Sequence, residues 1–224
     1  MKKKIIENLK TLIYALILAI IIRSFIFKPF YIPSSSMEPN LLVGDRLFVT
    51  KYSYGYSKHS FPFSPPIFSG RIIYNQPKRG DVVVFLYPCD PSIKYIKRLV
   101  GLPGDEITYN NKELTINGIK VKSKYQTVYK DPKQYGSHVY EEIIDEGNHS
   151  LLLTPSRRGR EGSFSVPDGH YFFMGDNRDN SRDSRYECPG FVSRDLFVGR
   201  ATRIWFNWDF SSFPEWGRIG DKIE

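Results

Sequence analysis

The chain has 224 residues, with 32 Lys and Arg against 24 Asp and Glu, and its formal net charge is +8. This length suits one domain, or one core with a sizeable insertion, and is enough to bury a hydrophobic core. The basic excess is typical of a solvated surface, and its expected functional use is attraction to anionic lipid headgroups. Binding of nucleic acid is disfavoured, because the sequence has no basic helix, zinc finger or aromatic RNA-binding motif.

The N-terminus is predicted to be a membrane anchor. A lysine cluster precedes an uncharged apolar run at 11–22, and after Arg23 the apolar character continues to Phe27. Residues 9–27 would form a helix long enough to cross roughly 30 Å of hydrocarbon at about 1.5 Å per residue, with Arg23 able to reach water at the far end. The lysines predict a cytoplasmic N-terminus and a chain that continues on the outer side.

Two alternatives to an uncleaved anchor are weaker. A cleaved signal peptide needs small residues before the cut, but Arg23 and Phe25-Ile26-Phe27 occupy that place, and no Ala-x-Ala follows. A buried core helix is the other alternative, but so uniform an apolar surface seldom follows a lysine cluster in a soluble domain.

The chain contains two cysteines, Cys89 and Cys188, both on the predicted outer side. An even pair in an oxidising compartment permits a disulfide, and two free thiols are the alternative. Two cysteines alone make a poor metal site. The pairing stays open on the sequence.

After the anchor the sequence predicts a mainly β fold. Residues 114–121 contain the hairpin signal Asn117-Gly118, and the run at 60–70, rich in Pro, Ser and Phe, is expected to be a loop. Residues 108–165 are more polar and charged, and are expected to be an insertion in the apolar core. Further short segments rich in β-branched and aromatic residues are expected to be strands, at 47–50, 81–87, 95–100, 171–174 and 201–205.

A serine–lysine pair is the reactive combination that remains after other mechanisms are excluded. A serine hydroxyl needs a neighbouring base to become a good nucleophile. The four histidines, expected at the surface or in loops, are His59, His138, His149 and His170. The sequence has no Gly-x-Ser-x-Gly, Ser-x-x-Lys, His-Glu-x-x-His or Cys-x-x-Cys motif, which disfavours other serine-hydrolase classes and metal mechanisms. A serine–lysine dyad is a known variant of the triad.

Lys97 suits the role of the base for a physical reason. Strand alternation places Tyr95, Lys97 and Leu99 on one face and Arg98 on the other. An ammonium group between Tyr and Leu would lose hydration, which lowers its pKa from about 10.4 and favours the neutral amine. The alternative is an ordinary strand lysine whose ammonium group extends to water.

Two polar segments complete the candidate site. Ser34, Ser35 and Ser36 follow Pro33, and serines in that position often only form a turn. The segment at 174–185, MGDNRDNSRDSR, is dense in hydrogen-bonding groups, although a solvated loop is the alternative. Within it, Asp183 and Arg185 are expected to pair, and Ser181 is expected to orient a neutral lysine amine.

Four blocks in order make the chain resemble a bacterial type I signal peptidase, a membrane-anchored serine–lysine endopeptidase. The blocks are PSSSMEP at 33–39, GDRLFV at 44–49, a third block with RGDVVVF at 79–85, YIKR at 95–98 and GLPGD at 101–105, and the segment at 174–185. The resemblance covers most of the chain outside 108–165. It implies an antiparallel β-sheet catalytic core with an inserted β-rich subdomain and one N-terminal transmembrane helix. The expected division is anchor 1–29, core 30–107, insertion 108–165 and core 166–224.

The resemblance also implies a role for each site residue. Ser36 would be the nucleophile and Lys97 the general base. Ser34, with the backbone N–H of Ser36, would form the oxyanion hole. The residues that would support the site are Tyr95, Ser181, Asp183 and Arg185. The chain departs from the family pattern at Arg182, where many members have a small or apolar residue, and by showing only one membrane span where some members have two.

The implied partners are secreted precursors with Ala-x-Ala-like cleavage sites and the lipid bilayer, with no nucleic acid, cofactor or metal. The aromatic residues that could sit at the membrane interface are Phe25, Phe27, Phe30, Tyr31, Trp205, Trp208 and Trp216, and core packing is the alternative for the tryptophans. Rival functions are a serine–lysine protease for conjugal-pilin maturation or regulatory self-cleavage, and a non-enzymatic membrane-anchored binding protein. No DNA-binding module supports self-cleavage, and a binding protein would not explain the four blocks.

Overall fold

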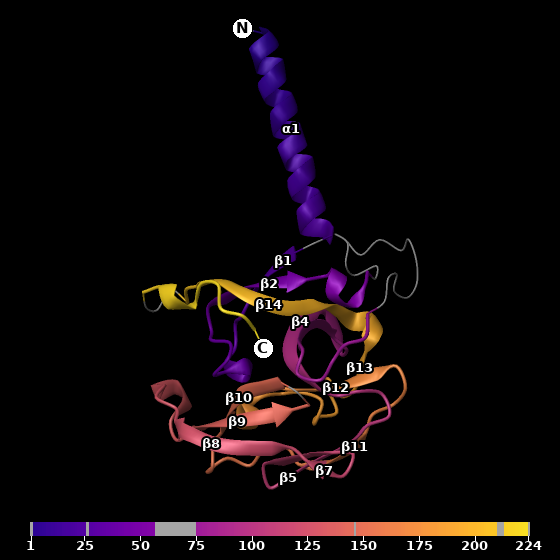
Figure 1. Cartoon of the computed structure of the whole chain (residues 1–224), viewed down its shortest axis with the longest axis vertical. Helices are drawn as coiled ribbons and strands as arrows, with labels where there is room; N and C mark the ends of the chain where they lie inside the picture. The colour runs from indigo at the N-terminus through magenta and orange to yellow at the C-terminus, as the bar shows by residue number, and fades with distance from the viewer. Residues whose placement is uncertain (1, 26, 57–74, 146, 210–212, 224) are drawn as a thin grey trace.

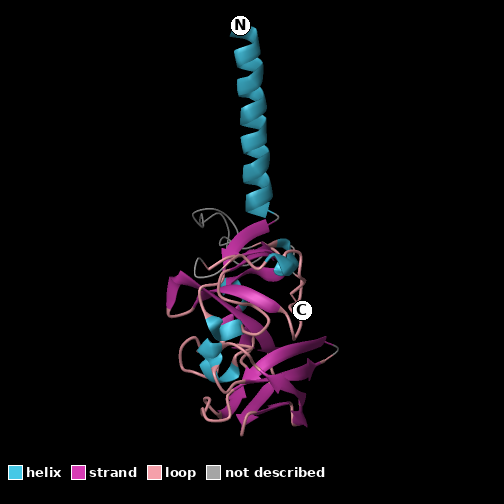
Figure 2. Ribbon diagram, turned by 90° about the vertical axis from the view of Figure 1, so that its left-hand side faces the viewer, coloured by secondary structure: helices cyan, strands magenta, loops and turns pink. Residues whose placement is uncertain are grey.

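The computed structural model describes residues 2–25, 27–56, 75–145, 147–209 and 213–223. A single α-helix, α1 (Lys2–Phe25), extends from a body made almost entirely of strands (Figures 1 and 2). Strand pairs within all three sheets are antiparallel, so the predicted mainly β, antiparallel class is confirmed. No helix in the described part of the chain combines the length and apolarity needed to cross a bilayer. The anchor at 9–27 therefore stays a prediction.

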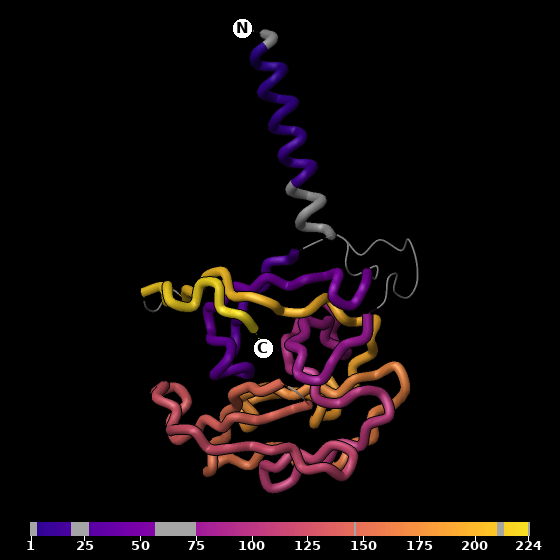
Figure 3. Tube along the Cα trace, in the orientation of Figure 1, coloured from indigo at the N-terminus to yellow at the C-terminus, as the bar shows by residue number. Residues whose placement is uncertain are grey.

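The main sheet has seven strands in the order β1-β2-β14-β3-β4-β12-β13. Its strands β14 and β2 are far apart in sequence yet pair along most of their length, as the Cα trace shows (Figure 3). The bounds are β1 Phe27–Tyr31, β2 Asp45–Thr50, β3 Val82–Tyr87, β4 Asp90–Gly101, β12 His170–Met174, β13 Val192–Ser193 and β14 Phe197–Asn207.

Two smaller sheets contain the remaining strands, in the orders β10-β9-β8 and β11-β5-β6-β7. The pairing of β5 with β11 brings together the two ends of the expected insertion. The bounds are β5 Glu106–Asn110, β6 Glu113–Ile116, β7 Ile119–Lys120, β8 Lys122–Val128, β9 His138–Ile144, β10 Gly147–Leu153 and β11 Gly162–Ser165.

Short 3₁₀ turns connect these strands. They are η1 Ser35–Met37, η2 Tyr52–Tyr54, η4 Pro132–Gln134, η5 Arg178–Asn180, η6 Arg194–Leu196 and η7 Trp216–Arg218. The first of them, η1, contains the predicted nucleophile, and η5 belongs to the polar segment at 174–185.

Each segment predicted as a strand overlaps a strand of the structure, although the segment at 81–87 begins one residue before β3. The predicted hairpin is formed by β6 and β7, with Asn117 and Gly118 at positive φ of 51° and 76°, the backbone that an Asn-Gly turn adopts. Two strands run longer than the sequence indicated, since β4 begins at Asp90 and β14 extends to Asn207. The loop expected at 60–70 lies outside the described residues.

Strand β3 shows why the centre of the main sheet forms. Its side chains are buried on both faces, with Val82 and Val84 in one apolar cluster and Val83 and Phe85 in another. A strand covered on both faces is expected to have a continuous apolar sequence, which this segment has. The first of these clusters also contains Met37, from the turn at η1, so burial of apolar surface fixes that turn against the sheet.

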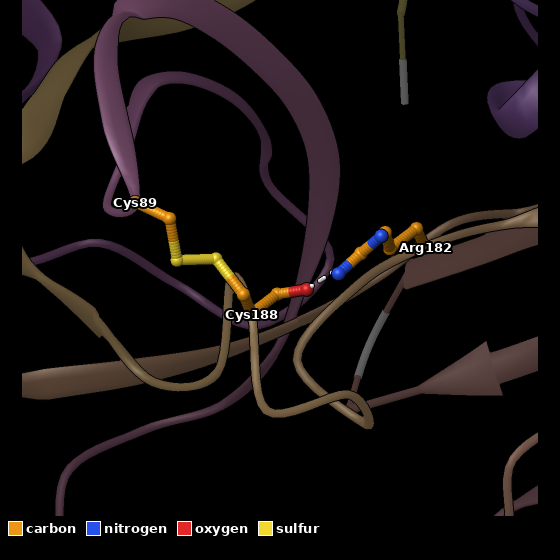
Figure 4. The surroundings of a disulfide bond; sticks show 3 residues. All are labelled: Cys89, Arg182 and Cys188. Carbon is orange, nitrogen blue, oxygen red and sulfur yellow. Dashed lines mark hydrogen bonds between the residues drawn. A yellow bond between two sulfur atoms is a disulfide. The ribbon is translucent and has the colours of Figure 1, made fainter.

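Cys89 and Cys188 form a disulfide, whereas the sequence had left open whether they are bonded or are two free thiols. Their Cα atoms are 6.5 Å apart, and the bond joins positions separated by 99 residues. It connects the turn between β3 and β4 to the segment that follows the polar loop at 174–185 (Figure 4).

Candidate active site

The candidate nucleophile lies on a short turn between β1 and β2. Ser36 is in η1 and is 8% exposed, and Met37 beside it is fully buried. The backbone N–H of Leu41 donates to the Met37 carbonyl at 2.9 Å, and Leu41 is itself buried. The buried side chains of Met37 and Leu41 therefore hold the turn in place. The Ser36 hydroxyl points toward Lys97 on strand β4.

Lys97 on β4 lies directly against this serine. A hydrogen bond of 2.6 Å joins its Nζ to Ser36 Oγ, and Nζ also donates to the Ile96 carbonyl at 3.0 Å. The side chain is buried, and Nζ lies 5.3 Å from the centre of the Tyr95 ring. Burial lowers the pKa of Lys97 to about 8, against the opposing effect of the Asp183 and Asp176 carboxylates. The amine is therefore much easier to deprotonate than that of an exposed lysine.

Ser34 is the exposed residue that precedes η1. Its hydroxyl oxygen lies 3.4 Å from Ser36 Oγ, so it reaches the same reaction centre from the solvent side. A hydroxyl can donate a hydrogen bond to an oxygen that becomes negative beside it.

The polar segment at 174–185 folds against the dyad and is not a solvated loop. Asp183 and Arg185 form a buried ion pair of 2.8 Å, and the Gly175 N–H donates to Asp183 at 3.0 Å. Burial opposes ionisation of Asp183, but the guanidinium of Arg185 holds the pKa of that carboxyl below its usual range. Ser181 is buried and also helps to lower the pKa of Asp183. Among the described residues no hydrogen bond joins Ser181 to Lys97.

Gly175 lies where the segment passes closest to the nucleophile. A Cβ added at this position would overlap both Ser181 Oγ and the Ser36 carbonyl oxygen. The sequence contains Gly175 within the fourth block, but no sequence pattern showed that the backbone of another segment would approach it. Close approach of two backbone segments is a typical reason for glycine.

Two asparagines, which sequence reasoning missed, hold the turn at η1. The Asn177 N–H donates to the Ser36 carbonyl, and its side-chain amide donates to the Ser35 carbonyl, each at 3.1 Å. Asn180 donates to Ser35 Oγ at 3.0 Å. The backbone of the nucleophile turn is thus fixed by the same segment that contains Asp183.

A layer of buried charges lies behind the dyad, on the other face of β4. Arg98 forms an ion pair with Asp176 at 2.8 Å, and Asn40 donates to the same carboxylate at 2.7 Å. The expectation of a surface or loop position is wrong for His149, which lies buried on β10 with Nε2 3.2 Å from a Glu142 oxygen. Burial, and then the charge of Arg98, lower the pKa of His149. His59 lies outside the described residues.

The arrangement can perform nucleophilic catalysis without any metal ion, since a buried amine contacts a hydroxyl. Within the described ranges, no group of three or more His, Cys, Asp or Glu side chains could hold a metal. A hydroxyl, an adjacent amine of lowered pKa and a second hydroxyl nearby are the groups that a serine hydrolase with a lysine base would need.

Comparisons with known proteins identify the family. The model of the family described as "Signal peptidase, peptidase S26" matches residues 5–206. A signal peptidase I of Pseudomonas fluorescens is 40% identical over 96% of this chain and 78% of its own length. One from Rickettsia typhi is 39% identical over 92% of this chain and 81% of its own. A crystal structure of a signal peptidase I from Enterococcus faecalis is 29% identical over 56% of this chain and 97% of that chain, with a TM-score of 0.36. The chain belongs to the signal peptidase family, peptidase S26, and is a serine endopeptidase.

Proposed function

We propose that the protein removes N-terminal signal peptides from secreted precursors, with Ser36 as nucleophile and neutral Lys97 as general base. The observation that carries this assignment is the 2.6 Å contact between Ser36 Oγ and a lysine amine that is buried and of lowered pKa. A lysine in water would be protonated at neutral pH and could not accept the serine proton. Burial at this position lessens that obstacle, because with a pKa of about 8 a fraction of the amine is neutral at pH 7.

The reaction follows from the positions of these groups. Neutral Lys97 accepts the proton of Ser36 while Oγ attacks the scissile carbonyl carbon. The hydroxyl of Ser34 and the N–H of Ser36 stabilise the negative oxygen that forms, and such a contact contributes about 3–4 kcal/mol in other enzymes. Protonated Lys97 gives its proton to the leaving amine, which departs as the new N-terminus. Lys97 then deprotonates a water molecule that hydrolyses the acyl-enzyme.

Three interactions keep the dyad in this geometry in the proposal. The Ile96 carbonyl accepts from Nζ at 3.0 Å and so orients the amine. The ion pair of Asp183 with Arg185 fixes the segment that holds Gly175 against Ser36. Tyr95 covers the amine with its ring at 5.3 Å. Ser181 is predicted to orient Lys97, and its side chain lies against the same segment, where a Cβ at Gly175 would touch both Ser181 and the Ser36 carbonyl.

We propose that the substrate segment ends in Ala-x-Ala and binds as an added strand, as extended peptides often bind to sheet edges. The membrane is the expected location. In Figure 1, β1 and β2 lie next to the end of α1, and β14 lies beside β2. The exposed aromatic side chains of these three strands include Phe27, Tyr31, Phe48 and Trp205. Exposed aromatic residues beside an anchor helix suit a membrane interface. The anchor would keep Ser36 near the bilayer, where the apolar part of the substrate ends.

Two single substitutions test the dyad. Ser36→Ala and Lys97→Ala should each abolish cleavage of a precursor ending in Ala-x-Ala, assayed in detergent by the appearance of the mature product. Circular dichroism and thermal melting of each variant would show whether the fold is kept. The control is Lys94→Ala, an exposed lysine on the same strand, which should cleave at the wild-type rate. Cleavage retained by either dyad variant would contradict the assignment.

A further inference from the structure

Arg182 projects to solvent from a segment whose neighbouring side chains face the dyad. Ser181 and Asp183 are buried, at 7% and 0% exposure, whereas Arg182 is exposed. The backbone at Ser181 is extended, with φ −130° and ψ 128°, and consecutive side chains of extended backbone point in opposite directions. Since a Cβ at Gly175 would touch both Ser181 and Ser36, the segment lies directly against the nucleophile. Arg182 therefore lies on the solvent-facing side of this segment, one residue from the contact of Ser181 with the nucleophile turn.

The position of this guanidinium is fixed at one point. Arg182 Nε donates a hydrogen bond of 3.0 Å to the Cys188 carbonyl (Figure 4). Cys188 is bonded to Cys89, in the turn at the start of β4, and β4 carries Lys97. One of the five N–H donors of the guanidinium is occupied by this bond, and the charged end stays available to a ligand.

The charge of Arg182 acts on the active site and is not neutralised by a partner. It lowers the pKa of Tyr95, although burial and the neighbouring Tyr87 raise that pKa overall. The Tyr95 ring in turn lies 5.3 Å from Lys97 Nζ. No carboxylate in the described part of the chain forms an ion pair with Arg182. A substrate that enters the site meets an uncompensated positive charge.

We propose that Arg182 is a specificity-determining residue, which favours precursors with an acidic side chain in the first positions of the mature chain and disfavours those with a basic one. The inference rests on the proposed function of the Ser36–Lys97 site. Signal peptides carry their charges at the far N-terminal end, followed by an apolar segment and small residues at the cut. Charge near the scissile bond therefore varies on the mature side, and this is where an exposed guanidinium can discriminate.

A peptide series measures this selectivity. Peptides with the same Ala-x-Ala cleavage site carry Asp, Asn or Lys at each of the first mature positions, and kcat/KM is determined for each with the full chain in detergent. Because an exposed ion pair contributes about 0.2–1 kcal/mol, we expect an Asp peptide to exceed its Asn partner by roughly 1.4- to five-fold at the position nearest Arg182. A Lys peptide should fall below the Asn peptide. The ratio of kcat/KM between the Asp and Lys peptides should shrink in 1 M salt, where the electrostatic screening length is about 3 Å.

Two variants and a control separate charge from structure. In Arg182→Gln, which lacks the charge, the ratio of kcat/KM for Asp over Lys peptides should fall close to one. Arg182→Lys should keep most of the wild-type ratio, because lysine retains the positive charge but not the guanidinium. Lys124→Gln removes one positive charge from exposed strand β8 and should leave the ratio unchanged. An Asp to Lys ratio that is the same in wild type and Arg182→Gln at every position overturns the proposal, as does an equal loss of activity on all peptides. Failure of the wild type to cleave any peptide, or cleavage by Ser36→Ala, would instead contradict the proposed function.

Discussion

Burial of Lys97 favours the neutral amine that the proposed mechanism needs, and it reduces the stability of the fold. Its pKa in the folded chain is about 8, against 10.5 for an ordinary lysine. The difference corresponds to roughly 3 kcal/mol that favours the neutral amine. Below about pH 8 the unfolded chain binds the proton more tightly than the folded one, so the full penalty is present, and it disappears as the pH rises through 10.5. Destabilising features of this kind are common at functional sites.

The first prediction follows from this penalty. Lys97→Met should abolish cleavage and raise the free energy of unfolding at pH 7 by up to roughly 3 kcal/mol, because the apolar side chain needs no hydration. Urea unfolding at pH 7 and at pH 10.5 measures the effect, and the gain should become small at the higher pH. A variant less stable than wild type at both pH values would show that the amine is not held in a costly state.

The pH dependence of the reaction gives a second prediction. Because the neutral amine is the active form in the proposed mechanism, kcat/KM should rise with pH through about 8 and then level off. Initial rates on an Ala-x-Ala peptide between pH 6 and 10 would measure this. A constant rate across this range, or a midpoint at the value of free lysine, would mean that Lys97 is not the titrating base.

At the scale of single residues, sequence patterns predicted which face of a strand a side chain occupies, but not which distant residues it contacts. Strand alternation placed Lys97 and Arg98 on opposite faces, which agrees with the contact of Lys97 to Ser36 and of Arg98 to Asp176. The roles proposed for Ser36 and Lys97 depended on the family resemblance, since 61 residues separate them. A charged residue such as Arg98 is normally expected at the surface. Arg98 is buried because its partner Asp176 lies on a distant segment, and the sequence alone does not show that pairing.

At the scale of elements, local signals were sufficient for the strands. The apolar run at β3 and the Asn117-Gly118 turn each gave the correct structure, because both depend on residues close in sequence. The pairing of distant strands was not contained in these signals. Neither was the disulfide, because Cys89 and Cys188 come together only when the β3–β4 turn meets the segment after the polar loop.

The disulfide should stabilise this junction. Replacing both cysteines by serine, as Cys89→Ser with Cys188→Ser, should lower the free energy of unfolding by roughly 2–4 kcal/mol, since a bond that closes so long a loop restricts the unfolded chain. Thermal melting of the double variant would measure the loss. Wild-type protein in reductant is the control and should melt like the double variant. Equal melting of oxidised and reduced wild type would show that the bond contributes nothing.

At the scale of the whole molecule, polar contacts connect the expected insertion at 108–165 to the segments of the active site. Glu142 on β9 forms a buried ion pair with Arg178 in η5, and Asn40, after the nucleophile turn, donates to the Ser150 carbonyl on β10 at 2.6 Å. The division of the chain at 108 and 165 remains a proposal. These contacts predict that the insertion and the catalytic segments unfold together.

Glu142 makes this prediction testable through acid stability. Burial raises the pKa of its carboxyl, but Arg178 outweighs that effect and holds the pKa at about 2, against 4.5 for an ordinary glutamate. The carboxylate therefore contributes stability that is fully present above about pH 4.5 and is lost as the pH falls toward 2. Glu142→Gln should reduce the free energy of unfolding at pH 7 by about 3–5 kcal/mol, because Arg178 stays buried without a countercharge.

The control for this variant is Glu141→Gln, whose carboxylate on the same strand accepts from Gln126 and Asn148 at a more exposed position. It should change the stability far less. Urea unfolding at pH 7 and pH 3 should show a smaller gap between wild type and Glu142→Gln at pH 3, since wild type has begun to lose the same interaction. Peptide cleavage followed in parallel should decline at the same urea concentration as the loss of structure. If the activity of Glu142→Gln persists after its insertion has unfolded, the buried pair does not couple the two parts of the molecule.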